Sequence, residues 1–186
     1  FFHGYYDQHM YHPLVIFDGE RGQLVSVVLR PGTAHAARGA MGVLRRIIHR
    51  LKQRFPRTQI VVRGDSAFAM PRILRLLETL NRELGGIAYV VGLAQNAVLL
   101  RAGAAAGSEA RRRFLATKQP VQHFDAFAYA AESWSHPRHV VMKAEVSEHG
   151  ANPRFVVTSL VEFAPALLYH AYCERGQCEN FIKDFK

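Results

Sequence analysis

Two short apolar stretches near the start of the chain have the composition of β-strands. Residues 11–17 and 23–29 are rich in valine, leucine, isoleucine and aromatic side chains, which strands favour. Between them, residues 18–22 read Asp-Gly-Glu-Arg-Gly and supply the residue types that turns require. We therefore predict an antiparallel hairpin over residues 11–29.

A helix with one basic side is predicted to follow the hairpin. Residues 36–55 carry apolar side chains at spacings of three and four, which is typical of an amphipathic helix. The basic positions could border a DNA channel, although most such faces are simply solvated. The apolar positions are Met41, Leu44, Ile48, Leu51 and Phe55, and the basic ones are Arg38, Arg45, Arg46, Arg50, Lys52 and Arg54.

The next elements predict a mixed sheet with helical crossovers. Residues 59–65 and 87–93 are short apolar runs, and a helix begins between them at Pro71 and ends at Gly85. A strand reached through a helical crossover is usually parallel to its neighbour. We expect Asp65 at the carboxyl end of a central strand, where open α/β sheets usually place their ligand sites.

The composition changes after residue 96. Residues 97–119 are rich in alanine and arginine and predict a helix with a flexible stretch at 103–107, and three strands follow it. We interpret this β-rich block as an insertion into, or an extension of, the same sheet. The strands are expected at residues 124–130, 140–146 and 155–160.

The chain is expected to consist of three parts. They are a core at residues 1–96, a β-rich subdomain at 97–163 and a closing helix at 164–186.

Composition and charge narrow the classes of function. The 186 residues are 49% hydrophobic and 21% charged, and no apolar run approaches the roughly 20 residues of a membrane span. A net charge of +9 favours a polyanionic partner such as nucleic acid, although membrane surfaces and solubility also select for it. The start of the chain does not read as a signal peptide, so we expect a cytoplasmic protein. Cys173 and Cys178 predict neither a disulfide nor a zinc site.

The closing helix carries a polar stripe with candidate chemistry. Read as one continuous helix, Tyr172, Arg175, Glu179 and Lys186 fall within an arc of about 60°. A carboxylate beside a guanidinium, an ammonium and a phenol can hold a metal ion and contact phosphate oxygens. A solvated charged face is the ordinary alternative. The adjoining arc is apolar and predicts a docking face made of Cys178, Phe181, Ile182 and Phe185.

The spacing of this stripe resembles the Y-R-E-K motif of insertion-sequence DDE transposases. Two, three and six residues separate its four members, without a gap. Earlier stretches resemble other landmarks of the same catalytic domain, in the same order. These are Tyr11-His12-Pro13-Leu14, Leu29-Arg30-Pro31-Gly32 with His35, and Arg63-Gly64-Asp65-Ser66-Ala67-Phe68.

The resemblance implies a ribonuclease-H-like α/β fold that cleaves DNA strands and transfers them during transposition. It makes Asp65 and Glu179 the second and third acids of a two-metal site for Mg²⁺, with Mn²⁺ as a substitute. It places Tyr172, Arg175 and Lys186 on transposon-end DNA. It also implies double-stranded DNA partners, both transposon ends and target, a homodimer of the full-length protein, and a prokaryotic cytosolic, nucleoid-associated location.

One feature departs from the family pattern. The first catalytic acid of the family lies on a strand that this sequence does not contain, so we expect the first strand to be missing and two strand edges to be unpaired. We therefore interpret the chain as an internal fragment that is inactive alone. The alternatives are a decayed or repurposed DNA-binding remnant and a metal-dependent nuclease of the same fold.

Overall fold

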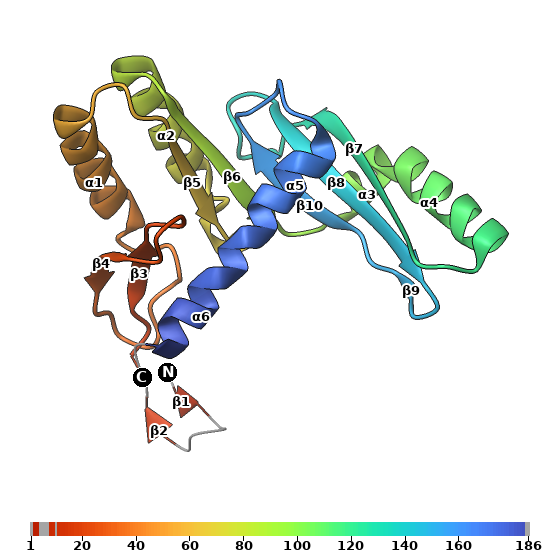
Figure 1. The fold of residues 1–186 in the computed structure, drawn as a ribbon, viewed down its shortest axis with the longest axis horizontal. Coiled ribbons are helices and arrows are strands. Elements are labelled where there is room, and N and C mark those ends of the chain that lie inside the picture. Colours follow the sequence, from red (N-terminus) through yellow and green to blue (C-terminus); the bar gives the residue numbers. More distant parts are fainter. Residues whose placement is uncertain (1, 4–7, 10, 185–186) are drawn as a thin grey trace.

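The hairpin predicted at the start of the chain is confirmed. The computed structural model describes residues 2–3, 8–9 and 11–184. Strands β3 (Leu14–Phe17) and β4 (Leu24–Val28) pair antiparallel, with a bulge after Ile16. They form a two-stranded sheet of their own, and the short strands β1 (Phe2–His3) and β2 (Gln8–His9) form another (Figure 1).

The main sheet is mixed, as the sequence predicts. Its path runs β5-β6-β10-β8-β7; β5 is parallel to β6, the remaining neighbours on the path are antiparallel, and β9 is attached to β8. The α/β fold class is therefore confirmed. The strands are β5 (Ile60–Gly64), β6 (Ile87–Leu93), β7 (Val121–Tyr129), β8 (Arg138–Ser147), β9 (Gly150–Ala151) and β10 (Arg154–Thr158).

Helices cover both faces of this sheet. Helices α1 and α2 lie over one half and α3 and α4 over the other, while α5 and α6 cross diagonally (Figure 1). Side chains alternate between the two sides: Tyr89 and Val91 belong to one hydrophobic cluster, and Val90 packs with Leu168 of α5 in a second. The helices are α1 (Ala40–Arg54), α2 (Pro71–Leu84), α3 (Ala97–Ala102), α4 (Ala104–Thr117), α5 (Pro165–Cys173) and α6 (Gln177–Asp184).

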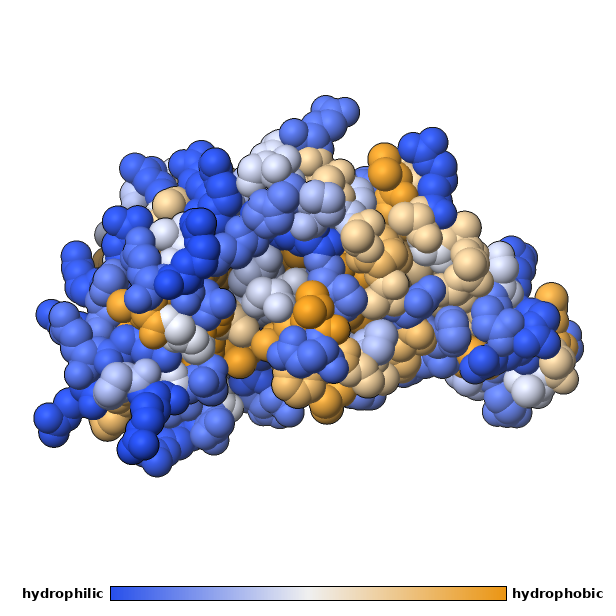
Figure 2. Space-filling view, turned by 90° about the horizontal axis from the view of Figure 1, so that it is seen from above, coloured by the Kyte–Doolittle hydropathy of each residue, from blue (hydrophilic) through white to orange (hydrophobic). Residues whose placement is uncertain are grey.

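The β-rich block continues the same sheet. Strand β10 is hydrogen-bonded to β6 on one side and to β8 on the other. The division of the chain into a core, a β-rich subdomain and a closing helix remains a prediction. From above, hydrophilic side chains dominate the part of the molecule over α1, whereas apolar ones gather towards the middle and the α4 side (Figure 2).

The hairpin β3–β4 and strand β5 are not hydrogen-bonded to each other within the described part of the chain, which leaves an open strand edge on each. Strand β5, expected in the centre of the sheet, is instead its terminal strand, because the hairpin β3–β4 is not hydrogen-bonded to it. A cavity of about 90 Å³ separates the two, lined by Leu14 and Ile16 of the hairpin and by Val62 of β5. These are the open edges that the sequence leads us to expect.

Three expectations about helices need correction. The first helix begins at Ala40, and Leu51 and Phe55, expected in the core, are 37% and 54% exposed. The stretch expected to be flexible is helical from Ala104 onwards. Gly103 separates α3 from α4, and a Cβ added there would require the end of the Met142 side chain to shift.

The third correction concerns the closing helix, which is not continuous. A 3₁₀ turn, η2 (Glu174–Gly176), separates α5 from α6. A 3₁₀ turn has about three residues per turn, so it rotates the later side chains relative to the earlier ones. The arc was calculated for a continuous α-helix, and the side chains of Glu179 and Lys186, which would test it, lie outside the described residues.

Lys52 belongs to the core and not to the exposed basic side of α1. Lys52 is 6% exposed, and its Nζ donates to the carbonyl oxygens of Thr58 at 2.6 Å and Pro56 at 3.5 Å. These bonds satisfy backbone acceptors beyond the end of α1, which explains why a charged group is buried there.

We expect Lys52→Ala to lower the free energy of unfolding by roughly 2 kcal/mol, because it removes a buried charged donor and its hydrogen bonds to the carbonyls of Pro56 and Thr58. Arg50→Ala on the exposed side of α1 is the matched control and should change stability by less than about 0.5 kcal/mol. Urea denaturation of both variants measures the difference. Equal stability of the two variants would contradict the structural role of Lys52.

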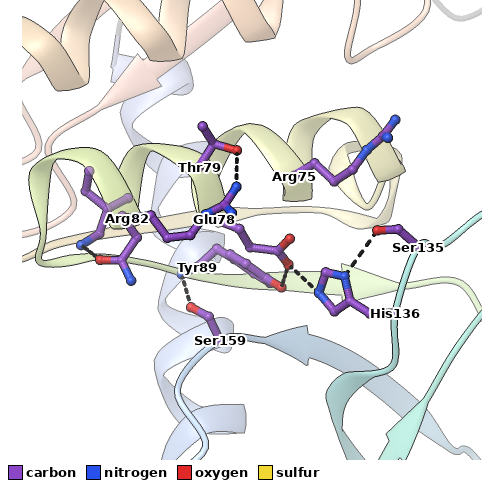
Figure 3. A pocket seen from close by; sticks show the side chains of 10 residues that line it. Arg75, Glu78, Thr79, Arg82, Tyr89, Ser135, His136 and Ser159 are labelled. Carbon is purple, nitrogen blue, oxygen red and sulfur yellow. Dashed lines mark hydrogen bonds and ion pairs between the residues drawn. The ribbon is translucent and has the colours of Figure 1, made fainter.

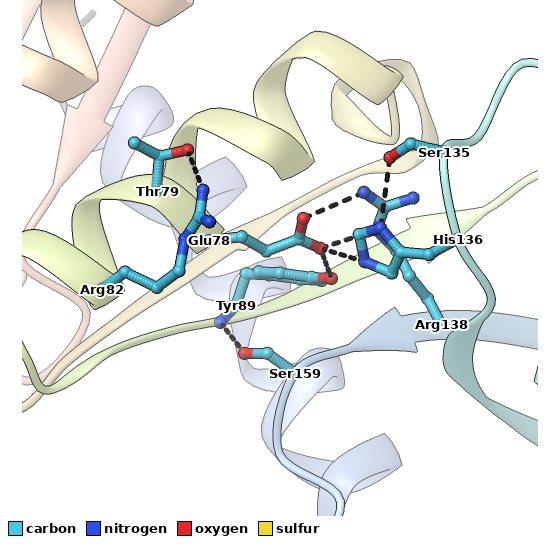
Figure 4. Close-up of polar contacts among 8 residues, drawn as sticks. All are labelled: Glu78, Thr79, Arg82, Tyr89, Ser135, His136, Arg138 and Ser159. Carbon is cyan, nitrogen blue, oxygen red and sulfur yellow. Dashed lines mark hydrogen bonds and ion pairs between the residues drawn. The ribbon is translucent and has the colours of Figure 1, made fainter.

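A charged network joins α2 to strands β6 and β8 (Figure 4). Arg138, 5% exposed, donates from Nε and Nη2 to the two carboxylate oxygens of Glu78 at 2.7 and 3.0 Å. The Tyr89 hydroxyl donates to Glu78 at 2.9 Å, and the Arg138 guanidinium lies 4.9 Å from the Trp134 ring centre. Burial acts to raise the pKa of Glu78, but the hydrogen bonds of Arg138 and Tyr89 and the Arg138 charge outweigh it, so the pKa is lowered.

Because Glu78 has a lower pKa in the folded chain than its ordinary value of 4.5, its contribution to stability is complete above that value. The contribution is lost as the pH falls through the folded pKa. We expect Glu78→Gln to lower the free energy of unfolding at pH 7 by roughly 2 kcal/mol and to flatten its decline below about pH 5. Urea denaturation across pH measures both effects, with Glu83→Gln on the exposed side of α2 as control. An unchanged acid slope would contradict the assignment.

Candidate active site

Asp65 lies directly after strand β5, where the sequence places it. Its carboxylate oxygen Oδ1 accepts a hydrogen bond from the Ala67 backbone N–H at 2.9 Å and so caps the short 3₁₀ helix η1 (Ser66–Phe68). The cap fixes the orientation of the carboxylate at the end of the strand. Asp65 is partly exposed, so one oxygen is held by the backbone while the group still borders solvent.

Tyr172 of α5 reaches the segment that follows Asp65. The two meet over Gly92 of β6, on the face of the sheet that α5 covers. A Cβ built on Gly92 would lie 2.5 Å from the Tyr172 hydroxyl and 3.1 Å from the Ser66 backbone nitrogen. A cavity of about 140 Å³ at this point is lined by Ser66, Gly92, Tyr172 and Arg154 among others. Residues far apart in the sequence therefore converge beside the Asp65 turn.

Arg175 contacts Tyr172 despite the break in the helix. Its guanidinium lies 5.2 Å from the centre of the Tyr172 ring, within the range of a cation–π interaction. The ring of Tyr169 lies beside that of Tyr172, with ring centres 6.0 Å apart, and burial raises the pKa of Tyr169 to about 12. Tyr169 is therefore a neutral phenol at physiological pH that supports the Tyr172 ring.

The remaining two members of the predicted stripe are less defined. The backbone of Glu179 belongs to α6, but its side chain lies outside the described residues, as does Lys186. Helix α6 itself docks on the hairpin, because the Phe181 ring lies 5.4 Å from the Phe17 ring. Ile182, expected on the docking face, is instead 41% exposed.

Arg63 holds the end of α5 beside Asp65, a role that sequence reasoning missed. Its Nη1 donates to the Ala171 carbonyl at 3.0 Å and to Glu174 Oε2 at 2.5 Å. Ala171 lies in the last turn of α5, so Arg63 hydrogen-bonds a carbonyl oxygen near the end of that helix. The only sequence signal is an arginine at the end of the apolar run Ile60-Val61-Val62, which gives no partner.

The acids and bases of the described residues do not form a complete metal site by themselves. Within residues 2–3, 8–9 and 11–184, no group of three His, Cys, Asp or Glu side chains could hold an ion. The arginines of the basic side, which lie on α1 except for Arg38 just before it, are exposed, so their place beside DNA remains a prediction. These are Arg38, Arg45, Arg46, Arg50 and Arg54.

We expect Gly92→Ala to displace Tyr172, because the added methyl group would overlap the phenol and crowd the backbone after Asp65. The free energy of unfolding should fall by about 1–3 kcal/mol, and amide exchange in residues 66–68 and 169–173 should accelerate. Gly107→Ala in α4 meets no atom within 4 Å and should raise stability by about 0.5–1 kcal/mol. Unchanged exchange in Gly92→Ala would contradict the close approach of Tyr172.

Comparisons with known proteins agree with this architecture. No described helix has the length and apolar character needed to cross a membrane. The searches of curated proteins and of solved structures find no match. The sequence model of one family, described as transposase DDE domain group 1, matches residues 1–186, and the mixed sheet with helices is consistent with its ribonuclease-H-like fold. The chain therefore belongs to the transposase DDE domain group 1 family, which supports a transposase-type function.

Proposed function

We propose that this chain supplies two acids, Asp65 and Glu179, to the catalytic site of a DNA transposase that cleaves and transfers DNA strands. One observation carries the proposal: the Asp65 turn and Tyr172 of the closing helix meet over Gly92. This contact brings strand β5, which Asp65 follows, to helix α5, which leads into the helix α6 that contains Glu179. Arg63 reinforces it through Ala171 and Glu174.

Asp65 has the chemistry of a ligand for a hard divalent cation. Carboxylate oxygens are the ligands that Mg²⁺ prefers, and Mn²⁺ accepts the same set. The Ala67 cap orients Asp65 before any ion arrives. Bound metal ions would supply activation of a water or 3′ hydroxyl and stabilisation of the leaving oxygen.

Tyr172 and Arg175 are suited to contact DNA phosphates. Arginine can stack on an aromatic ring while its N–H groups remain directed at an anion. The net charge of +9 favours the approach of DNA to the whole surface. Lys186 would add a further cation.

We also propose that two protomers of the full-length protein act together on two transposon ends, in the nucleoid.

We further propose that the 186-residue chain alone does not cleave DNA. Two-metal chemistry requires several carboxylates at one place, and Asp65 has no pair of acidic or histidine neighbours among the described residues that would complete such a group. Cleavage of labelled transposon-end DNA by the purified chain with Mg²⁺ or Mn²⁺ would overturn this part of the proposal.

Substitutions in an active transposase that contains this chain test the roles of the acids. Asp65→Asn keeps a side chain that can cap η1 but removes its charge. Glu179→Gln likewise removes the charge of the second acid while keeping the size of the side chain. Both should abolish cleavage of labelled transposon-end DNA while leaving DNA affinity within about twofold, because only the metal ligands are lost. The exposed Glu132→Gln is the matched control. Full activity of both acid variants would show that the metal ligands are wrongly assigned.

Arg175→Ala tests the DNA contact separately. It should weaken DNA binding and reduce the salt dependence of affinity by about one unit of slope, because one phosphate contact is lost. Fluorescence anisotropy over a range of salt concentrations measures both quantities. A salt slope equal to that of the unsubstituted protein would contradict the contact.

A further inference from the structure

A second concave site lies on the face of the sheet opposite Tyr172. The groove has a volume of about 510 Å³ and lies between α2 and the turn that precedes β8 (Figure 3). The buried Tyr89, whose ring packs in the cluster on the α2 side, forms part of its wall. The polar side chains that line it include Arg75, Thr79, Arg82, Ser135, His136 and Ser159.

Helix geometry sets the two arginines of α2 apart along one face. Arg75 and Arg82 are seven residues apart, or about two turns, so they share this face at a spacing of about 10 Å along the axis. A single phosphate group is too small to contact both. Successive phosphates of a nucleic-acid strand are several ångströms apart, so two different phosphates of one strand can contact the two arginines.

The groove carries an excess of positive charge. Glu78 is the one acid among its described lining residues, and Arg138 engages both of its carboxylate oxygens. Arg75 forms no ion pair within the described part of the chain, and Arg82 donates to the neutral hydroxyl of Thr79 at 3.0 Å. The charges of Arg75 and Arg82 are therefore not offset inside the groove.

The opposite wall adds hydrogen-bonding groups that suit phosphate oxygens. Ser135 and His136 come from the turn before β8, and the Ser135 hydroxyl lies 3.1 Å from His136 Nδ1. Both residues are exposed. His136 Nε2 lies 3.5 Å from Glu78 Oε1, so the same network that fixes Arg138 also positions this wall (Figure 4).

We propose that this groove binds the phosphate backbone of a nucleic-acid strand, with Arg75 and Arg82 as its two main cations. It would hold a stretch of DNA separate from the one assigned to Tyr172 and Arg175. The site lies on the other face of the sheet, so this proposal does not depend on the catalytic role of Asp65, and each can fail without the other.

The test compares charge-matched pairs of substitutions in the 186-residue chain. Arg75→Ala with Arg82→Ala should weaken binding of a labelled 20-base-pair duplex by roughly 10- to 100-fold near 0.1 M salt and reduce the salt slope by about two. The control pair, Arg101→Ala with Arg111→Ala on α3 and α4, removes the same charge from exposed positions elsewhere. Fluorescence anisotropy measures affinity, and circular dichroism verifies that each variant is folded.

Three further arms make the outcome specific. Arg75→Lys with Arg82→Lys should restore most of the affinity, because the charges remain. Combining the alanine pair with Arg175→Ala should add the losses of affinity, because the two sites lie on opposite faces. Inorganic phosphate and a single nucleotide should compete only weakly. The proposal is overturned if the alanine pair matches the control pair, or if inorganic phosphate competes as well as the duplex.

Discussion

The burial of strand β6 on both of its faces is the constraint on which the rest of the structure depends. Its side chains alternate between the cluster under α2 and the cluster under α5, and they are nearly all buried. On its edges it pairs with β5 in parallel and with β10 antiparallel. Burying apolar side chains on both sides stabilises the sheet and fixes the register of every neighbouring strand.

This strand also determines how closely the closing helix can approach. The absence of a side chain at Gly92 leaves room for the Tyr172 phenol beside the backbone of Ser66. Arg63 then ties the end of α5 to β5 through Ala171. A position without a side chain and a partly exposed arginine together bring the Asp65 turn and the Tyr172–Arg175 pair to one place.

The two faces of the sheet have different polar features. On the α5 face, Arg175 stacks on Tyr172 next to the Asp65 turn. On the α2 face, Arg138 neutralises Glu78, so the charges of Arg75 and Arg82 are not offset inside the groove. A chain with a net charge of +9 thus presents basic groups in two defined places.

The sequence by itself determined the elements and the position of Asp65, because the period of apolar residues and the turn residues are local properties. Strand β6 and the start of α2 at Pro71 agree with the predicted bounds. Only the tertiary structure decided that Lys52 is buried, that η2 lies between α5 and α6, and that Tyr172 and Ser66 meet over Gly92. These features depend on contacts between segments distant in the sequence, and no local pattern of apolar and polar residues encodes the partner of a single side chain.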